Sequence, residues 1–174
     1  MTIINAQNLS KQRVYYISKT ISGFTLLEVL ITMSILAFGM LGVAKLQLNS
    51  LRDTQNAQFQ TKANLFVQQM ATHITANNSV LNSYQLNFKQ QPNASIDCQV
   101  SSCSPSEIAQ YDLMQWHQSI SKSLPSGSAQ ISVNNNDATI IVHWDENRDG
   151  SIGSNCPKES TADLECIKIK RSFR

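Results

Sequence analysis

Residues 23–44 decide the fold and read Gly23-Phe-Thr-Leu-Leu-Glu-Val-Leu-Ile-Thr-Met-Ser-Ile-Leu-Ala-Phe-Gly-Met-Leu-Gly-Val-Ala44. From Phe24 to Ala44 the run holds one charged side chain, that of Glu28. An α-helix of this length extends about 30 Å, which matches the hydrocarbon thickness of a bilayer. The sequence therefore predicts a membrane-spanning helix over residues 24–45 that carries a single acid.

The segment that precedes the apolar run is basic. Residues 1–23 contain Lys11, Arg13 and Lys19 and no acid, whereas the whole chain has 14 basic and 12 acidic residues. Removing three bases leaves 11 against 12 acids, so the positive charge belongs to this leader. The positive-inside rule then predicts a cytoplasmic N-terminus and a periplasmic remainder. A net charge of +2 does not indicate nucleic-acid binding, and we expect none.

A helical pattern continues beyond the apolar run. Apolar residues recur at spacings of three and four along a segment rich in Gln, Asn and Thr; they are Phe59, Ala63, Phe66, Val67, Met70, Ala71 and Ile74. One helix over residues 24–77 would be about 80 Å long. A chain of this size cannot bury such a helix. Its first half is therefore expected in lipid or against other helices, and its second half is expected to carry a folded head, residues 46–174.

The head contains signals for both strands and a helix. Strand-like alternation occurs at 84–88, 130–133, 138–144 and 164–171, and turn residues at 134–137 predict a hairpin. Ser104, Pro105 and Glu107 form a capping box at the start of a helix over 105–124. The apolar face of that helix comprises Ala109, Leu113, Trp116, Ile120 and Leu124. The predicted fold class is α+β, with the long helix packed on a small antiparallel sheet and one additional helix.

All four cysteines lie downstream of the apolar run, in the part expected outside the cytoplasm. An even number in an oxidising compartment predicts two disulfides, for which three pairings are possible. We expect Cys98–Cys103 and Cys156–Cys166, because short loops close with the smallest loss of entropy. Free buried thiols and a zinc site are the alternatives, although the spacings C-x4-C and C-x9-C are not typical of zinc fingers.

The segment Gly23-Phe-Thr-Leu-Leu-Glu28 closely resembles the cleavage and methylation signature of type IV prepilins. In that family a membrane peptidase cuts after the glycine at the cytoplasmic face and methylates the new N-terminus. The resemblance implies cleavage between Gly23 and Phe24, N-methylation of Phe24, and an assembly role for Glu28. The expected localisation is the inner membrane and then a pilus at the cell surface.

Physical chemistry gives Glu28 a role of its own. A carboxylate within a membrane helix costs about 2.5–3.5 kcal/mol on insertion scales, so such residues are usually functional. Cleavage would leave an α-amino group on Phe24 in the same apolar surroundings. Pairing between that amine and the Glu28 of a staggered neighbouring helix would compensate two buried charges. A carboxyl group that is protonated or that reaches the interface is the alternative.

A narrower resemblance lies in the head. Asp112-Leu-Met-Gln-Trp116, Leu124-Pro-Ser-Gly127 and Ile141-Val-His-Trp-Asp-Glu146 are similar to segments of the minor-pilin family PilV, or pilus modification protein. This resemblance implies a low-copy subunit that promotes pilus initiation, assembly or tip function. Cell adhesion and twitching motility are inherited from the family as further hypotheses. For Trp116 and Trp144 themselves we expect core packing between helix and sheet.

One segment resembles half of a calcium-binding loop. Asp145, Asn147 and Asp149 precede Gly150 in the pattern D-x-N-x-D-G, but the twelfth position is Cys156 rather than glutamate. Glu159, Asp163 or Glu165 would have to supply the missing ligand. A calcium loop and a plain acidic turn are both open at this point, and no other cofactor is expected.

The sequence holds no pattern typical of catalysis, so we expect no enzymatic activity. The expected partners are other major and minor pilins, the prepilin peptidase, the inner-membrane pilus assembly machinery and membrane lipid. Two alternatives share features with this interpretation. A pseudopilin of a type II secretion system carries the same N-terminal signature, and a signal-anchored periplasmic protein would keep its N-terminus uncut.

Overall fold

A computed structural model describes residues 23–173 of the chain. The predicted leader, residues 1–23, lies outside these residues except for Gly23. The chain divides into two compact units, Met1–Leu46 and Gln47–Arg174, and helix α1 (Leu26–Ala76) contributes residues to both. The observed bounds of α1 agree with the helix predicted over 24–77.

In the first unit, α1 is exposed throughout its described length. Among residues 23–173 it is the one helix that is long and apolar enough to cross a membrane, and its most apolar window has a mean hydropathy of 2.2. No residue of that window is buried within the chain. The apolar side chains here must therefore be covered by lipid or by other proteins.

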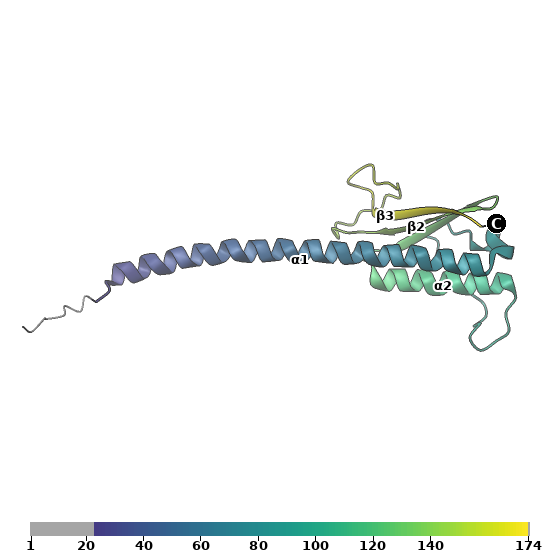
Figure 1. The fold of residues 1–174 in the computed structure, drawn as a ribbon, viewed down its shortest axis with the longest axis horizontal. Helices are drawn as coiled ribbons and strands as arrows, with labels where there is room; N and C mark the ends of the chain where they lie inside the picture. The colour runs from purple at the N-terminus through teal and green to yellow at the C-terminus, as the bar shows by residue number, and fades with distance from the viewer. Residues whose placement is uncertain (1–22, 174) are drawn as a thin grey trace, which may run out of the picture. The chain divides into compact units, whose positions relative to one another are not determined.

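In the second unit, the C-terminal part of α1 is amphipathic. Its buried side chains are Ala63, Val67, Met70, Ala71 and Ile74, and Phe59 and Phe66 are half-buried beside them. A short 3-10 helix, η1 (Asn78–Tyr84), follows. Helix α2 (Pro105–Ser123) then runs alongside α1 (Figure 1), where the indole Nε1 of Trp116 donates to the Phe66 carbonyl at 2.9 Å.

The start of α2 follows the predicted capping box. Ser104 Oγ accepts a hydrogen bond from the Glu107 amide at 3.4 Å, and the Glu107 carboxylate accepts one from the Ser104 amide at 2.7 Å. These two bonds satisfy amides that have no partner inside the helix. The backbone hydrogen bond to Ser104 is the main cause that lowers the pKa of Glu107, so the carboxylate stays ionised at the positive end of the helix.

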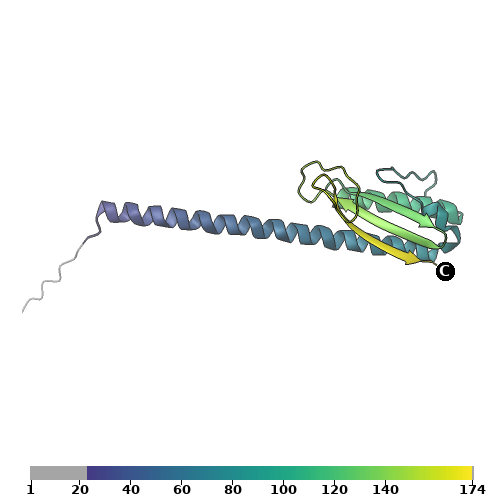
Figure 2. The same ribbon diagram turned by 90° about the horizontal axis from the view of Figure 1, so that it is seen from above.

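The sheet has three antiparallel strands in the order β1 (Ser128–Asn134), β2 (Asp137–Trp144) and β3 (Glu165–Ser172). The hairpin between β1 and β2 turns at Asn135, which has a φ of 52°. Asparagine is among the few residues that tolerate this left-handed conformation. Seen from above in Figure 2, the strands lie over the two helices of this unit.

The core lies between the sheet and the helices. Ile140 and Val142 of β2 are fully buried and Trp144 is 2% exposed, while Trp116 of α2 is 1% exposed. Both tryptophans therefore pack in the core, as predicted. The α+β fold class, with a long helix packed on a small antiparallel sheet and one extra helix, is confirmed.

The strand predicted at 84–88 is wrong in extent. Tyr84 ends the 3-10 helix, and only Leu86 pairs with β1, through two backbone hydrogen bonds to Ile131 at 3.0 and 2.9 Å. The backbone leaves the extended conformation at Lys89, whose φ is 60°. The alternation in the sequence is explained by burial, because Tyr84 and Leu86 both face the core.

Candidate functional site

The peptide bond between Gly23 and Phe24 lies ahead of α1 in a segment without regular structure. Phe24 is 84% exposed, and a β-carbon added to Gly23 would meet no atom within 4 Å. Nothing in the described fold therefore requires glycine at position 23. A requirement for glycine here would have to come from a protein that recognises the segment.

Thr25 and Glu28 form the first turn of α1. The Glu28 amide donates to Thr25 Oγ1 at 3.2 Å, as in a helix N-cap. The carboxylate of Glu28 is exposed and lies in the first turn, where the helix dipole favours negative charge. The structure thus places an acid, a helix start and the expected new N-terminus within six consecutive residues.

The cysteines form the two disulfides expected from the sequence, Cys98–Cys103 and Cys156–Cys166. The first closes a small loop between η1 and α2. The second joins β3 to the loop that follows β2. The structure contains no free cysteine among the residues it describes.

The predicted calcium-loop residues lie in the turn that follows β2. Asp145 is 4% exposed, and its two carboxylate oxygens accept hydrogen bonds from the amides of Asp149 and Gly150 at 3.2 and 2.9 Å. Asp149 Oδ1 accepts from the amide and hydroxyl of Ser151, whose side-chain hydrogen bond is the main cause that lowers the Asp149 pKa. The chain's own donors thus occupy these carboxylates.

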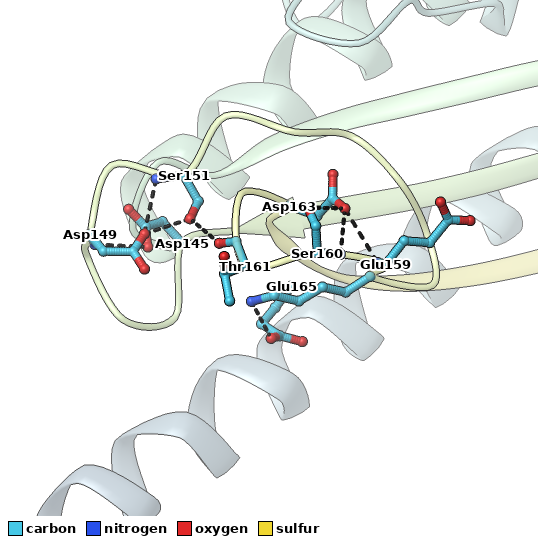
Figure 3. Close-up of polar contacts among 9 residues, drawn as sticks. Asp145, Asp149, Ser151, Glu159, Ser160, Thr161, Asp163 and Glu165 are labelled. Carbon is cyan, nitrogen blue, oxygen red and sulfur yellow. Dashed lines mark hydrogen bonds and ion pairs between the residues drawn. The ribbon is translucent and has the colours of Figure 1, made fainter.

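Of the acids proposed to complete the loop, Asp163 and Glu165 line the same small cavity as Asp145 and Asp149, together with Lys158. Figure 3 shows Asp145 and Asp149 at one end and Asp163 nearer the middle, beside Ser160. Asp163 Oδ2 accepts from the Ser160 amide at 2.9 Å and from the Ser160 hydroxyl at 3.0 Å. Within residues 23–173 no group of three or more His, Cys, Asp or Glu residues is placed to hold a metal ion. Calcium binding stays a prediction.

An internal cation lies in the same loop. Lys158 Nζ contacts Glu165 Oε1 at 2.9 Å, and this hydrogen bond is the main cause that raises the pKa of Lys158. The charges of Asp149 and Glu146 act in the same direction. Sequence reasoning did not identify Lys158, because its approach to these acids depends on how the loop folds back onto β3.

Asp112, from the motif at 112–116, joins three elements. Its Oδ2 accepts from the Tyr84 hydroxyl at 3.0 Å and lies 3.2 Å from Nδ1 of His73. Burial, with a contribution from the Asp112 charge, raises the pKa of Tyr84 to about 12. Together with the bond from Trp116 to Phe66, this network fastens α2 to α1 and η1.

His143 is a buried polar residue of β2. It is fully buried, and neither ring nitrogen has a hydrogen-bond partner among the described residues. Its ring packs edge-on against Phe88, with 4.9 Å between centroids. Burial lowers the pKa of His143 to about 4, so it is neutral at pH 7.

Two family models match the chain, one over its N-terminal motif and one over the following part of α1 and the head. A model of the prokaryotic N-terminal methylation motif matches residues 18–44, and a model described as type IV pilin Tt1218 matches residues 45–114. No curated protein and no solved structure gives a significant match. The two models adjoin at the end of the apolar run, close to the boundary between the two compact units. The chain is therefore a type IV pilin-like protein.

Proposed function

We propose that this chain is a minor pilin of a type IV pilus. It enters the inner membrane as a precursor with residues 1–23 in the cytoplasm and residues 46–174 in the periplasm. Prepilin peptidase cuts after Gly23 and methylates Phe24. The mature chain then joins the pilus in low copy, beside other pilins, and promotes initiation, assembly or tip function. Its role is structural rather than enzymatic.

The observation that best supports this proposal is that the segment around Gly23 is exposed and lies outside the helix. The scissile bond precedes the first helical residue, Leu26, and its flanking residues are exposed, so a peptidase can reach it without unwinding α1. The methylation-motif model matches this same stretch, residues 18–44. The peptide bond that the methylation motif marks for cleavage is therefore also one that a peptidase can reach.

In this proposal Glu28 sets the axial position of each α1 helix relative to its neighbours in the pilus. Its carboxylate has no hydrogen-bond or ion-pair partner among residues 23–173. An unpaired carboxylate in an apolar environment is unfavourable, and so is an unpaired amine. Pairing Glu28 with the Phe24 amine of an adjacent subunit removes both penalties at one axial stagger. Helices in another register would keep both charges uncompensated.

The head supports a pilus subunit over a secretion pseudopilin. The model that matches residues 45–114 describes a type IV pilin. Two of the three segments that resemble PilV have visible structural roles, since Asp112 and Trp116 fasten α2 and Gly127 lies against Ile120. A β-carbon at Gly127 would approach the Ile120 carbonyl oxygen to 2.7 Å, so the turn there requires glycine. Assignment to the PilV type rests on these segments.

Mass spectrometry of the mature N-terminus tests the proposal. In cells with prepilin peptidase we expect a chain that begins at methylated Phe24, and in cells without it a chain that begins at Met1. A Gly23→Ala variant should remain unprocessed or be processed poorly. An intact Met1 start in both strains would overturn the proposal and favour an uncut signal anchor.

A second measurement addresses Glu28 separately. Glu28→Ala should be processed at Gly23 but should be depleted from sheared pili, whereas Glu28→Asp should assemble in part. Normal incorporation of Glu28→Ala would refute the charge-pairing account and leave the pilin assignment intact.

A further inference from the structure

A polar cavity of about 290 Å³ lies within the second unit, between α1 and the turn that follows β2. Its lining comprises Arg52, Gln55, Asn56 and Phe59 of α1, and Glu146, Asn147 and Arg148 of the turn. Amide and guanidinium groups thus supply most of its polar side chains.

The two arginines of the cavity have no internal partner. Neither guanidinium forms a hydrogen bond or ion pair with the residues that the structure describes. The bases near β3 behave differently, because each of them contacts an oxygen of the chain; they are Lys158, Lys168, Lys170 and Arg171. Two guanidinium groups beside the single acid of the cavity leave an excess of positive charge. Their planar donors match the oxygens of a phosphate or carboxylate.

The turn that carries Arg148 is held in place from within. Arg148 has a φ of 56°, a left-handed conformation that residues with a β-carbon seldom adopt. The buried carboxylate of Asp145 fixes this turn through the amides of Asp149 and Gly150. The Asp145 amide in turn donates to the Pro125 carbonyl at 2.8 Å. Arg148 is therefore presented from a rigid backbone, which reduces the entropy lost when it binds a ligand.

The level of Arg52 along α1 identifies the source of the anion. Arg52 follows Ala44, the last residue of the apolar run, by eight positions, and so lies about 12 Å farther along the helix axis. The headgroup layer on each side of a bilayer is about 5–8 Å thick. Helical arginines lean toward the helix N-terminus and extend their charged ends toward the interface. The Arg52 guanidinium therefore reaches the level of the lipid phosphates.

We propose that Arg52 and Arg148 bind the phosphate of a phospholipid headgroup while the chain is anchored in the membrane. This inference deepens the proposed function and rests on the insertion of residues 24–44 in a bilayer. The phosphate joins α1 to the turn after β2, and so holds the folded unit at the periplasmic surface of the membrane. Extraction of α1 into a filament removes the phosphate and frees the cavity.

Native mass spectrometry of the full-length chain, released from detergent micelles with added phosphatidylglycerol, tests this site. Loss of one guanidinium at a phosphate surface should raise the dissociation constant of the bound lipid about fivefold, and loss of both about thirtyfold. We therefore compare Arg52→Gln, Arg148→Gln and the double variant with the unmodified chain. Diacylglycerol, which lacks the phosphate, should show no saturable binding, and millimolar inorganic phosphate should compete with the lipid.

A matched control uses Lys62→Gln. Lys62 is another base of α1 without a partner among the described residues, and it lies about 15 Å farther from the apolar run than Arg52. Its removal deletes the same charge and should change lipid affinity less than twofold. Circular dichroism of each variant verifies that the exposed substitutions leave the fold intact.

The lipid site would be overturned by a double variant that binds phosphatidylglycerol as tightly as the unmodified chain. If that variant has also lost cross-linking to a second pilin, the cavity binds a carboxylate of a neighbouring subunit instead. The mature N-terminus is measured by mass on the same samples, so failure of the lipid site is distinguished from failure of processing.

Discussion

His143 makes the stability of the folded unit depend on pH. The ring is fully buried and both nitrogens lack hydrogen-bond partners among residues 23–173, so protonation places an uncompensated charge in the interior. Its neighbours across the strands are Ser128 and Cys166, and Phe88 packs on its ring. None of these carries a charge, because Cys166 is in a disulfide.

The size of the effect follows from the pKa of His143. Burial lowers it from 6.5 to about 4 in the folded chain, while the unfolded chain keeps the ordinary value. Between these two values the unfolded state binds more protons than the folded state. The contribution of His143 to the free energy of unfolding is therefore fully present above pH 6.5 and is lost as the pH falls toward 4. A difference of this size corresponds to about 3 kcal/mol at 1.36 kcal/mol for each pH unit.

Urea unfolding of the full-length chain in detergent micelles measures this dependence. The fluorescence of Trp116 and Trp144 reports on the core, because both indoles are buried there. A His143→Gln variant should lose most of the slope between pH 4 and 6.5 while remaining folded at pH 7. His117→Gln is the matched control, since burial also lowers the pKa of His117 and its share must be measured separately. An unchanged slope in His143→Gln would refute the reasoning.

Three further predictions concern α2 and the turn after β2. Ser104→Ala removes the N-cap of α2 and should destabilise the folded unit by about 0.5–2 kcal/mol in urea unfolding, whereas the exposed Ser106→Ala should have little effect. Trp116→Phe replaces the indole by a smaller aromatic ring and removes its hydrogen bond to the Phe66 carbonyl, which keeps only its partner within α1. We expect a loss of about 1–3 kcal/mol, and a loss below about 0.5 kcal/mol would mean that water replaces the indole. For the calcium prediction, calorimetric titration of the full-length chain should give a saturable heat that Asp149→Asn abolishes, and no heat at millimolar calcium would end that hypothesis.

Elements with strong local signals were predicted well from the sequence. The limits of α1 follow from its apolar run and from the later stripe, and the start of α2 follows from the capping box at Ser104. The hairpin follows from turn residues between two alternating runs. Each of these signals acts between residues a few positions apart, so no knowledge of distant contacts is needed. The short disulfide loops belong to the same class.

The segment around Leu86 shows where local reasoning fails. Alternating apolar residues predicted a strand at 84–88, but the same pattern arises when Tyr84 ends a 3-10 helix and Leu86 pairs once with Ile131. Both arrangements bury the same two side chains. The choice between them depends on contacts with α2 and β1, such as the hydrogen bond from Tyr84 to Asp112.

Composition and short-range periodicity were enough to predict the helix that begins close to Gly23, the single acid of its apolar run, Glu28, and the α+β class of the head. Which polar groups lie together depends on how distant segments pack. His143 is a polar residue of β2 that no local pattern marks as buried, yet neighbouring segments bury it completely. Arg52 and Arg148 are 96 positions apart (148 − 52) and line one cavity. Contacts between such distant residues arise from packing and loop closure, which no local pattern in the chain records.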